Sequence, residues 1–584
     1  MIPEVAERGK ARRGQGIGRA AVMIGVITVL ARLVGFGRQV VFAHTVGTTC
    51  LGSAYTTANM VPNIIYDIVL GGALSAVVVP VLAGPARAAA GADDLAAESA
   101  RRISSALLTW TVLLLVPVSA ALALAAHPIV TVLLSHSSGC PRSVMAGVGA
   151  RMLIVFAPQV LLYGLAVVLY GILQSYRRFG APALAPLLSS LVVIAAYAAF
   201  GAIGGEYVFG NRLPALPPLA EYLLSGGTTL GVLALVATAV VPARRLGLRL
   251  RPMVRFPPGV GRRVRRLAVA GVLTLVAQDA SAAVVIVLAN RYGSTGALVI
   301  YGFAWAVFLV PFAVLAVPIA TSAFPALSAG ADVSAGAVSA GVVSADSVSA
   351  GAVARAPVAG TAGTGAAAVG GGFDETAAIS TRAVIVASWL GAAVLVGARW
   401  PLARVFESHD VPEAAVLALA LAAFAPGLVG YGISANLSRV LYARGRNRAT
   451  ALAIGGGWLL VIAADLVIVP LVAPRHVVPA LGLGMTFGLT VSGLALLILV
   501  RRDRGALALH GVSRAFVAGL VGAMAGAAVG TAVAGALPSP GFFFNVGMSV
   551  LVTVVVSAVF AAVAGSIDST DLRAAVGRLR ARPS

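Results

Sequence analysis

The sequence predicts an all-α protein that crosses a membrane many times. Of its 584 residues, 59% are hydrophobic and only 11% are charged, whereas about 25% of the residues in soluble domains are charged. Long apolar segments follow one another along the chain and are separated mostly by short turns. Because a spanning helix needs about 20 predominantly apolar residues, these segments predict about 14 transmembrane helices.

Each predicted helix corresponds to one apolar segment of the chain. The segments lie near residues 19–44, 52–83, 103–126, 147–173, 182–203, 217–243, 267–290, 297–327, 379–398, 413–442, 449–473, 478–500, 511–537 and 542–565.

The arginines predict the orientation of these helices. Turns 45–51 and 538–541 contain no Lys or Arg, whereas alternate turns are basic. Cytoplasmic loops of membrane proteins carry an excess of Lys and Arg, so we expect both termini in the cytoplasm. The same placement accounts for the formal net charge of +22 without a nucleic-acid partner. The basic stretches are Arg177–Arg178, Arg444–Arg448, Arg501–Arg504 and the nine arginines of 244–266.

Composition also divides the chain. The basic linker at 244–266 separates the first six predicted helices from the last eight. Its arginines are expected to orient the flanking helices, and contact with anionic lipid is expected as a second effect. A stretch rich in Ala, Gly, Ser and Val is expected to be a disordered cytoplasmic insert. The predicted regions are a cytoplasmic basic tail (1–17), an N-lobe (18–243), the linker (244–266), a C-lobe (267–500) containing the insert (329–372), two last helices (511–565) and a cytoplasmic tail (566–584).

Motifs for enzymatic chemistry are missing from the sequence. We find no zinc-type ligand spacing, no Walker loop and no credible nucleophile elbow, so we do not expect an enzyme. The two cysteines, Cys50 and Cys140, fall in predicted outer loops, where oxidation is permitted. A disulfide between them is one interpretation; two separate free thiols is the one that the sequence favours.

Polar residues within the first two predicted helices form the candidate site. Ionisable groups at membrane depth are costly and are therefore functional candidates. Arg32 and Arg38 flank two glycines in the first helix, Gly35 and Gly37, which weaken it and predict a hinge. The second helix carries polar residues at i, i+4, i+7 and i+8, on one face; they are Asn59, Asn63, Tyr66 and Asp67.

A basic face opposite a polar face predicts a wet cavity for an anionic ligand. Guanidinium groups suit phosphate oxygens because they offer paired donors and keep their charge. Alternatively, the arginines satisfy helix-end carbonyls or a buried carboxylate such as Asp67.

The same stretch resembles the MurJ (MviN) family of lipid II flippases, within the superfamily of multidrug and oligosaccharide-lipid exporters. The R-x-x-G-F-x-R run of Arg32 to Arg38, the P-N of Pro62–Asn63 and the G-x-x-x-x-x-x-V-P that ends at Pro80 carry the resemblance. Residues 172–190, residues 438–451 and the spacing of Pro311 and Pro325 also fit.

The resemblance implies a V-shaped, two-lobed bundle of pseudo-symmetric six-helix lobes, with helices 13 and 14 forming a lipid-exposed groove. It implies alternating access in a bacterial cell membrane. The implied cargo is an undecaprenyl-pyrophosphate-linked peptidoglycan precursor, and membrane lipids and cell-wall synthesis proteins are implied partners. Arg32 and Arg38 match the family's cavity arginines.

The chain departs from the family pattern at several cavity positions. Ser53 stands where many members carry Asp, Tyr66 and Asp67 stand where they carry basic residues, and Ala306 aligns with an arginine. The predicted cavity is therefore less positive than usual, which leaves the cargo open.

The resemblance also implies a monovalent cation such as sodium, since some family members bind sodium in the second lobe. Asp279, Asp465 and Thr486 are the expected ligands, because carboxylate and hydroxyl oxygens suit hard cations. Alternatively, each Asp is protonated or caps a neighbouring helix. We expect no other cofactor.

The sequence therefore favours a lipid II flippase that supports cell-wall synthesis. Two alternatives stay open at this point: an exporter of another polyprenyl-linked glycan or of a drug, and a non-transporting paralogue that scaffolds cell-wall machinery.

Overall fold

The computed structural model describes most of the chain, and every regular element in the described residues is a helix. The tail at 1–17, almost all of the insert and most of the C-terminal tail lie outside the described residues, so those expectations stay predictions. The described residues are 26–27, 29–68, 75–89, 93–134, 140–209, 213–247, 251–257, 260–324, 326–328, 372–407, 413–537 and 541–568.

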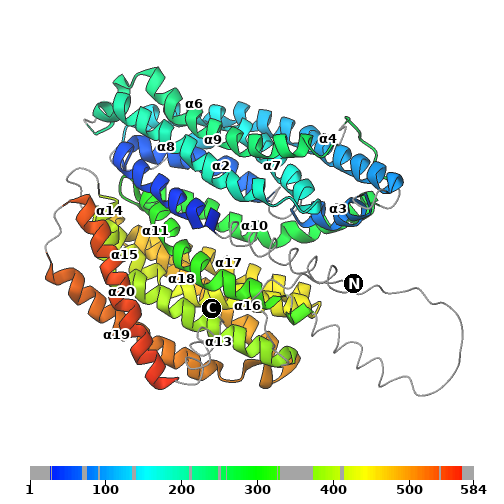
Figure 1. The fold of residues 1–584 in the computed structure, drawn as a ribbon. Coiled ribbons are helices and arrows are strands. Elements are labelled where there is room, and N and C mark those ends of the chain that lie inside the picture. Colours follow the sequence, from blue (N-terminus) through cyan, green and yellow to red (C-terminus); the bar gives the residue numbers. More distant parts are fainter. Residues whose placement is uncertain are drawn as a thin grey trace, which may run out of the picture.

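The helices form two lobes that lie one above the other in Figure 1. The N-lobe contains a first helix over 29–45, α2 (Cys50–Tyr66), α3 (Ser75–Ala89), α4 (Asp94–Leu124), α5 (Ala126–Leu133), α6 (Arg142–Phe156), α7 (Pro158–Ser175), α8 (Gly180–Phe209), η2 (Leu213–Ala215) and α9 (Pro218–Arg244).

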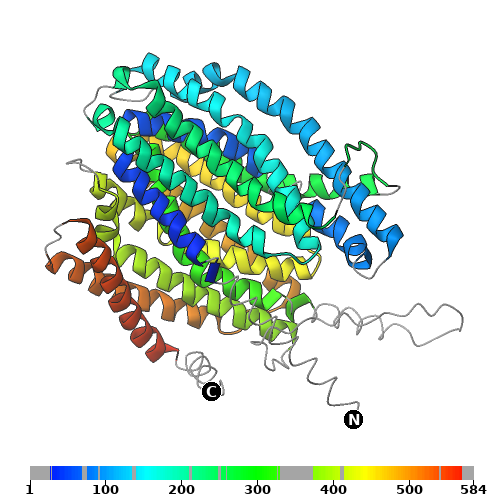
Figure 2. The ribbon, with the colours of Figure 1, turned by 45° about the horizontal axis from the view of Figure 1, so that its top comes forward.

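The C-lobe follows, and its helices α10 and α11 lie on the side that faces the N-lobe (Figure 1). Figure 2 shows the same bundle turned by 45°. The elements of the C-lobe are α10 (Val260–Tyr292), α11 (Ala297–Pro311), η3 (Phe312–Ala316), α13 (Phe373–Gly397), α14 (Arg399–Val405), α15 (Glu413–Phe424), α16 (Gly427–Ala443), α17 (Asn447–Ile468), η4 (Val469–Leu471), η5 (Pro474–His476), α18 (Val477–Arg504), η6 (Leu507–Leu509), α19 (Val512–Ala536) and α20 (Phe542–Ile567).

The helices make this a multi-pass membrane protein. In the described residues, 10 helices are long and apolar enough to cross a membrane, or 11 if the bent pair α15–α16 counts as one span. Each of the predicted apolar segments overlaps a helix or a pair of helices, which confirms the all-α membrane fold. The count of 14 stays a prediction.

Two names describe the ends of the bundle. The basic end carries the turns around Arg177–Arg178, Arg444–Arg446 and Arg501–Arg504, and the opposite end carries the turn 46–49.

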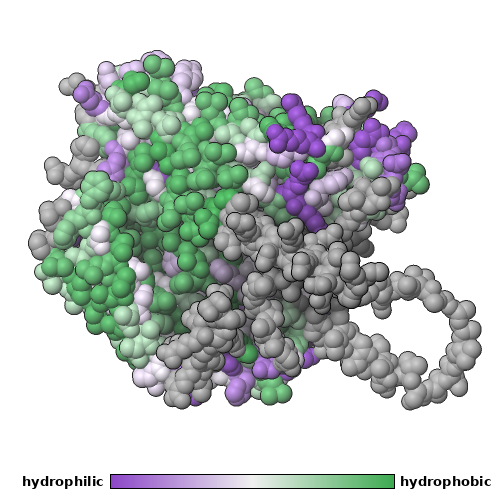
Figure 3. Space-filling model, in the orientation of Figure 1, coloured by the Kyte–Doolittle hydropathy of each residue, from purple (hydrophilic) through white to green (hydrophobic). Residues whose placement is uncertain are grey.

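Hydrophilic residues gather beside α3 and α4 in Figure 3, whereas a broad hydrophobic surface covers the flank of the bundle. That surface is what a helix bundle presents to lipid.

The linker between the lobes differs from its prediction. The helix α10 begins at Val260, seven residues before the predicted boundary, because arginines are good helix formers that hydropathy alone excludes. Residues 251–256 lie along α4: the backbone N–H of Met253 donates to Thr109 Oγ1 at 2.9 Å, and the indole of Trp110 donates to Val254 O at 2.9 Å. The linker is thereby fastened to the N-lobe.

The lobes meet at the opposite end of the bundle. There, Asn290 Nδ2 of α10 donates to Thr57 Oγ1 of α2 at 2.9 Å, and the N–H of Gly296 donates to Ser53 Oγ at 3.1 Å. One hydrophobic cluster contains buried residues of both lobes, including Leu51 and Leu298. Ser53, one of the departures from the family pattern, thus joins the two lobes.

A disulfide joins Cys50 and Cys140 near this end, with their Cα atoms 5.8 Å apart. The favoured interpretation of two free thiols was therefore wrong. The 90 residues that separate the cysteines carry no geometric information, so the sequence could not decide between the two interpretations.

The last two helices pack on the C-lobe, at one side of the bundle (Figure 1). Glycines let them approach closely: a Cβ on Gly530 of α19 would lie 3.1 Å from the Cα of Gly397 in α13, and a Cβ on Gly526 would lie 3.1 Å from Val556 O of α20.

Candidate functional site between the lobes

Arg38 lies half-buried in the first helix, and its Nε has no hydrogen-bond partner among the described residues. Its charge acts on the hydroxyls of Tyr55, Tyr163 and Tyr197, which come from α2, α7 and α8. No ion pair joins Arg38 to Asp67 within the described chain, and such a pair is one of the two alternatives that the sequence left open. The charge of the Arg38 guanidinium is therefore not neutralised by Asp67.

Arg32 lies almost two helical turns nearer the basic end and is exposed. The two arginines are six positions apart, so they do not point in the same direction on a straight helix. Arg32 thus lies at the edge of the site and Arg38 within it.

The tyrosines beside Arg38 are fixed by hydrogen bonds. The Tyr55 hydroxyl is 2.8 Å from the Tyr197 hydroxyl and 2.7 Å from Thr228 Oγ1, so α2, α8 and α9 meet at this buried network. Tyr66 and Tyr163 pack together with their ring centroids 4.4 Å apart. This network holds the groups around Arg38 in place without a carboxylate.

The predicted polar face of α2 is present. Asn59, Asn63, Tyr66 and Asp67 are all half-buried, and Asp67 forms the C-cap of the helix. The charge of Asp67 acts on Tyr66, Tyr163 and Asp279. The site thus has a positive side at Arg38 and a negative side at Asp67, with the two tyrosine rings beside both.

The expected cation ligands are not gathered in one place. Ala277 of α10 packs against Gly455 of α17, and both helices run away from the basic end. Asp279 lies two residues beyond Ala277, and Asp465 lies ten residues beyond Gly455. At a rise of 1.5 Å per residue, the levels of the two carboxylates along the helices therefore differ by about 12 Å. Among the described residues no group of three or more His, Cys, Asp or Glu could hold a metal.

Asp465 is nevertheless unusual. Its side chain is buried against Gly484, and neither carboxylate oxygen has a hydrogen-bond partner in the part of the chain that the structure describes. Thr486 Oγ1 donates to Ala423 O at 2.6 Å, which leaves its lone pairs available. The cation site stays a prediction, for which Asp465 and Thr486 remain candidates.

The two predicted hinge glycines lie in an unbroken helix. A Cβ added at Gly35 or Gly37 would meet nothing within 4 Å, so neither glycine is required for close packing. A conformational role remains the physical reason for glycine at both positions, and the hinge stays a prediction.

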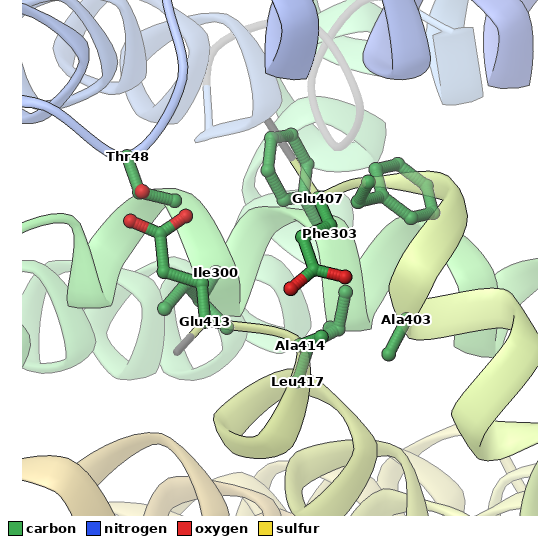
Figure 4. Close-up of a pocket in the computed structure, with 9 residues that line it drawn as sticks. Thr48, Ile300, Phe303, Ala403, Glu407, Glu413, Ala414 and Leu417 are labelled. Atoms are coloured by element: carbon green, nitrogen blue, oxygen red, sulfur yellow. The ribbon is translucent and has the colours of Figure 1, made fainter. Parts of the chain in front are cut away.

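A separate, small pocket lies at the opposite end. Figure 4 shows the carboxylates of Glu407 and Glu413 in the space below Thr48, so residues of both lobes line it. The pocket lies at the contact between the lobes, away from Arg38. Its lining residues are Thr48, Ile300, Phe303, Ala403, Phe406, Glu407, Glu413, Ala414 and Leu417.

The sequence reasoning missed the tyrosines around Arg38 and the proximity of Asp279 to Asp67. A buried Tyr usually needs a hydrogen-bond partner for its hydroxyl, which is a signal that could have drawn attention to Tyr163 and Tyr197. The proximity of the two carboxylates depends on how the lobes pack, for which the sequence gives no signal.

Comparison with known proteins agrees with the predicted resemblance. The family model described as lipid II flippase MurJ matches residues 42–351, more than half of the chain. A probable lipid II flippase MurJ of Synechocystis is 26% identical over 258 residues, which cover 43% of this chain and 44% of the relative. A lipid II flippase MurJ of Burkholderia cenocepacia is 26% identical over 312 residues, covering 53% and 57%. The matched region thus spans about half the length of these relatives.

Solved structures show the same fold. A lipid II flippase MurJ in an inward closed conformation superposes with a TM-score of 0.65 at 16% identity, covering 92% of this chain and 99% of the other. A multidrug MATE-family transporter in an inward-facing conformation gives a TM-score of 0.60 at 13% identity, covering 83% and 98%. At these identities the likeness concerns the fold alone.

Proposed function

The chain belongs to the MurJ family of lipid II flippases, and we propose that it moves lipid II, the undecaprenyl-pyrophosphate-linked peptidoglycan precursor, from the inner to the outer leaflet. The proposed location is the bacterial plasma membrane, with both termini in the cytoplasm. The proposed role is transport in support of cell-wall synthesis, without catalysis of a covalent step.

The observation that carries this proposal is the environment of Arg38. A pyrophosphate cannot cross hydrocarbon unaided, because its charges lose their hydration there. Among the described residues, Arg38 offers a guanidinium that makes no ion pair, beside the hydroxyls of Tyr163 and Tyr197. Such a group can exchange water for phosphate oxygens without first breaking an ion pair.

The contacts between the lobes indicate how access would alternate. The opposite end is closed by Asn290–Thr57, Gly296–Ser53 and a shared hydrophobic cluster. Release toward the outside requires these contacts to separate while the lobes rock. Bending of the first helix at Gly35 and Gly37 would let Arg38 follow the cargo.

We also retain the proposed cation at Asp465 and Thr486. The buried, unpartnered carboxylate of Asp465 fits a hard cation, which would neutralise its charge there.

Complementation tests the proposal. A cell depleted of its own flippase receives the wild-type chain, Arg38→Ala or the control Arg475→Ala, an exposed arginine at the opposite end, at equal membrane levels. The readout is lipid-linked precursor exposed on the outer leaflet. We expect exposure with the wild type and the control and loss with Arg38→Ala. No exposure with the wild type would contradict the proposed function.

A further inference from the structure

Two carboxylates, Asp67 and Asp279, lie at the same level on opposite sides of the lobe interface. The helices α2 and α10 run antiparallel there and are joined by the Asn290–Thr57 hydrogen bond of 2.9 Å. From this contact, Asp67 lies 10 residues farther along α2 and Asp279 lies 11 residues back along α10, or about 15 and 16 Å toward the basic end. The charge of Asp67 indeed acts on Asp279.

Among the residues that the structure describes, neither carboxylate has a basic partner. Asp279 is 3% exposed, and its Oδ2 has no hydrogen-bond partner in the described residues. Arg38 and Arg32 make no ion pair with either aspartate across the described part of the chain. Two like charges that share a poorly hydrated site repel each other, and a cation between them removes this cost.

The surroundings of the pair also suit a cation. The ring of Tyr66 lies next to Asp67 in sequence and packs on Tyr163 at 4.4 Å between centroids. Aromatic faces attract cations, and carboxylate oxygens bind both alkali-metal ions and ammonium groups. The positive charge of Arg38 acts on the same Tyr163, so the site separates an anion-binding side from a cation-binding side.

We propose that Asp67 and Asp279 form a cation-binding site shared by the two lobes. Its occupant is a monovalent cation: either a free alkali-metal ion or an ammonium group on the peptide of the cargo. The ammonium source rests on the proposed function, whereas the metal-ion source does not. This site differs from the one predicted at Asp465, because here Asp279 shares the cation with Asp67 and not with Asp465.

The first experiment measures the melting temperature of the purified full-length protein in NaCl, KCl or LiCl, with choline chloride at equal ionic strength as the reference. The variants are Asp67→Asn and Asp279→Asn, Glu206→Gln is the control, and Asp465→Asn reports on the separate cation site proposed at Asp465. Glu206 is exposed on α8, away from both sites. For a metal-ion occupant we expect an ion-specific increase in melting temperature that falls in both test variants and is unchanged in Glu206→Gln.

The second experiment measures equilibrium binding of a polyprenyl-pyrophosphate glycopeptide that carries a free amine, and of the same molecule with that amine acetylated. For an ammonium occupant we expect acetylation to weaken binding to the wild type at least tenfold. Asp67→Asn and Asp279→Asn should bind the two forms alike, since the group that recognises the amine is gone.

The outcomes separate this proposal from the proposed function. It is overturned if the wild type shows neither an ion-specific increase nor a preference for the free amine, whether or not it binds the cargo. It is also overturned if the ion effect persists in both test variants and disappears in Asp465→Asn. An ion effect confined to the Asp67–Asp279 pair, in a protein that moves no lipid II, supports the site and contradicts the proposed function. Because the ion dependence is first measured on the wild type, poor folding of a variant does not remove the test.

Discussion

Arg177 adopts, at the end of α7, the left-handed backbone conformation that Gly445 adopts at the end of α16, with φ of 57° and 70°. The closing hydrogen bonds also match: Arg178 N donates to Leu173 O at 2.8 Å, and Arg446 N donates to Leu441 O at 3.0 Å. The same helix ending therefore recurs in the two lobes, as expected of pseudo-symmetric repeats. In the N-lobe an arginine occupies the position at which glycine is favoured.

This relationship predicts opposite effects of two substitutions. Arg177→Gly should raise the stability of the protein by about 1 kcal/mol, because a side chain disfavours the left-handed conformation, whereas Gly445→Ala should lower it by about 1 kcal/mol. The measurement is thermal unfolding of the purified protein. Arg178→Gly is the control: it removes the neighbouring charge without relieving a positive φ and should not stabilise.

The disulfide gives a second prediction. Cys50→Ser or Cys140→Ser should destabilise the protein by about 2–4 kcal/mol, because the bond that closes a long loop is lost. Reducing agent should lower the melting temperature of the wild type to about that of the variants. It should leave the melting temperature of either variant unchanged. Equal melting temperatures of oxidised and reduced wild type would contradict the disulfide.

The packing of the last two helices gives a third prediction. Gly530→Leu should destabilise the docking of α19 and α20 by about 1–3 kcal/mol or more, because the new side chain meets Gly397 and Val556. Gly535→Leu, at a position where a Cβ meets nothing within 4 Å, is the matched control. The two variants are compared by thermal unfolding, and equal losses would argue against close packing at Gly530.

The hinge gives a fourth prediction. Gly35→Ala with Gly37→Ala should leave the folded protein at least as stable, since both sites are open and Ala favours a helix by about 1 kcal/mol over Gly. Flipping should nevertheless fall at least several-fold, because the first helix becomes harder to bend. Gly302→Ala, in an equally open position of α11, should have no such effect. Unchanged flipping in the double variant would reject the hinge.

The fastened linker gives a fifth prediction. Trp110→Phe with Thr109→Val and Ser105→Ala should release residues 251–256 from α4, because the three hydrogen bonds between the linker and this helix are lost. Trypsin should then cut the folded protein faster after Arg255, whereas the bond after Arg251 is protected by Pro252 in every variant. Cleavage at the wild-type rate would show that these bonds do not hold the linker.

The fold was predictable because membrane-spanning helices are defined by local composition. Hydropathy located the helices, but it placed the start of α10 after its arginines and missed α5 and α14, which are too short to span a membrane. These errors arise because hydropathy measures transfer to lipid rather than helix formation.

The candidate site was predictable only in part. The face of α2 follows from helical periodicity, so the sequence alone predicts that Asn59, Asn63, Tyr66 and Asp67 share one side of the helix. The approach of Asp279 to Asp67 and the tyrosines around Arg38 depend on contacts between distant helices. One sequence carries no record of such contacts.

Transport by the purified protein tests the central claim most directly. The chain is reconstituted as the sole protein in liposomes that contain lipid II, and the fraction of lipid II accessible from the outside is followed over time. We predict that the wild type moves lipid II across the bilayer, and that Arg38→Ala, reconstituted in equal amount, does not exceed protein-free liposomes. Movement by Arg38→Ala at the wild-type rate would contradict the role of Arg38, and no movement by the wild type would contradict the flippase itself.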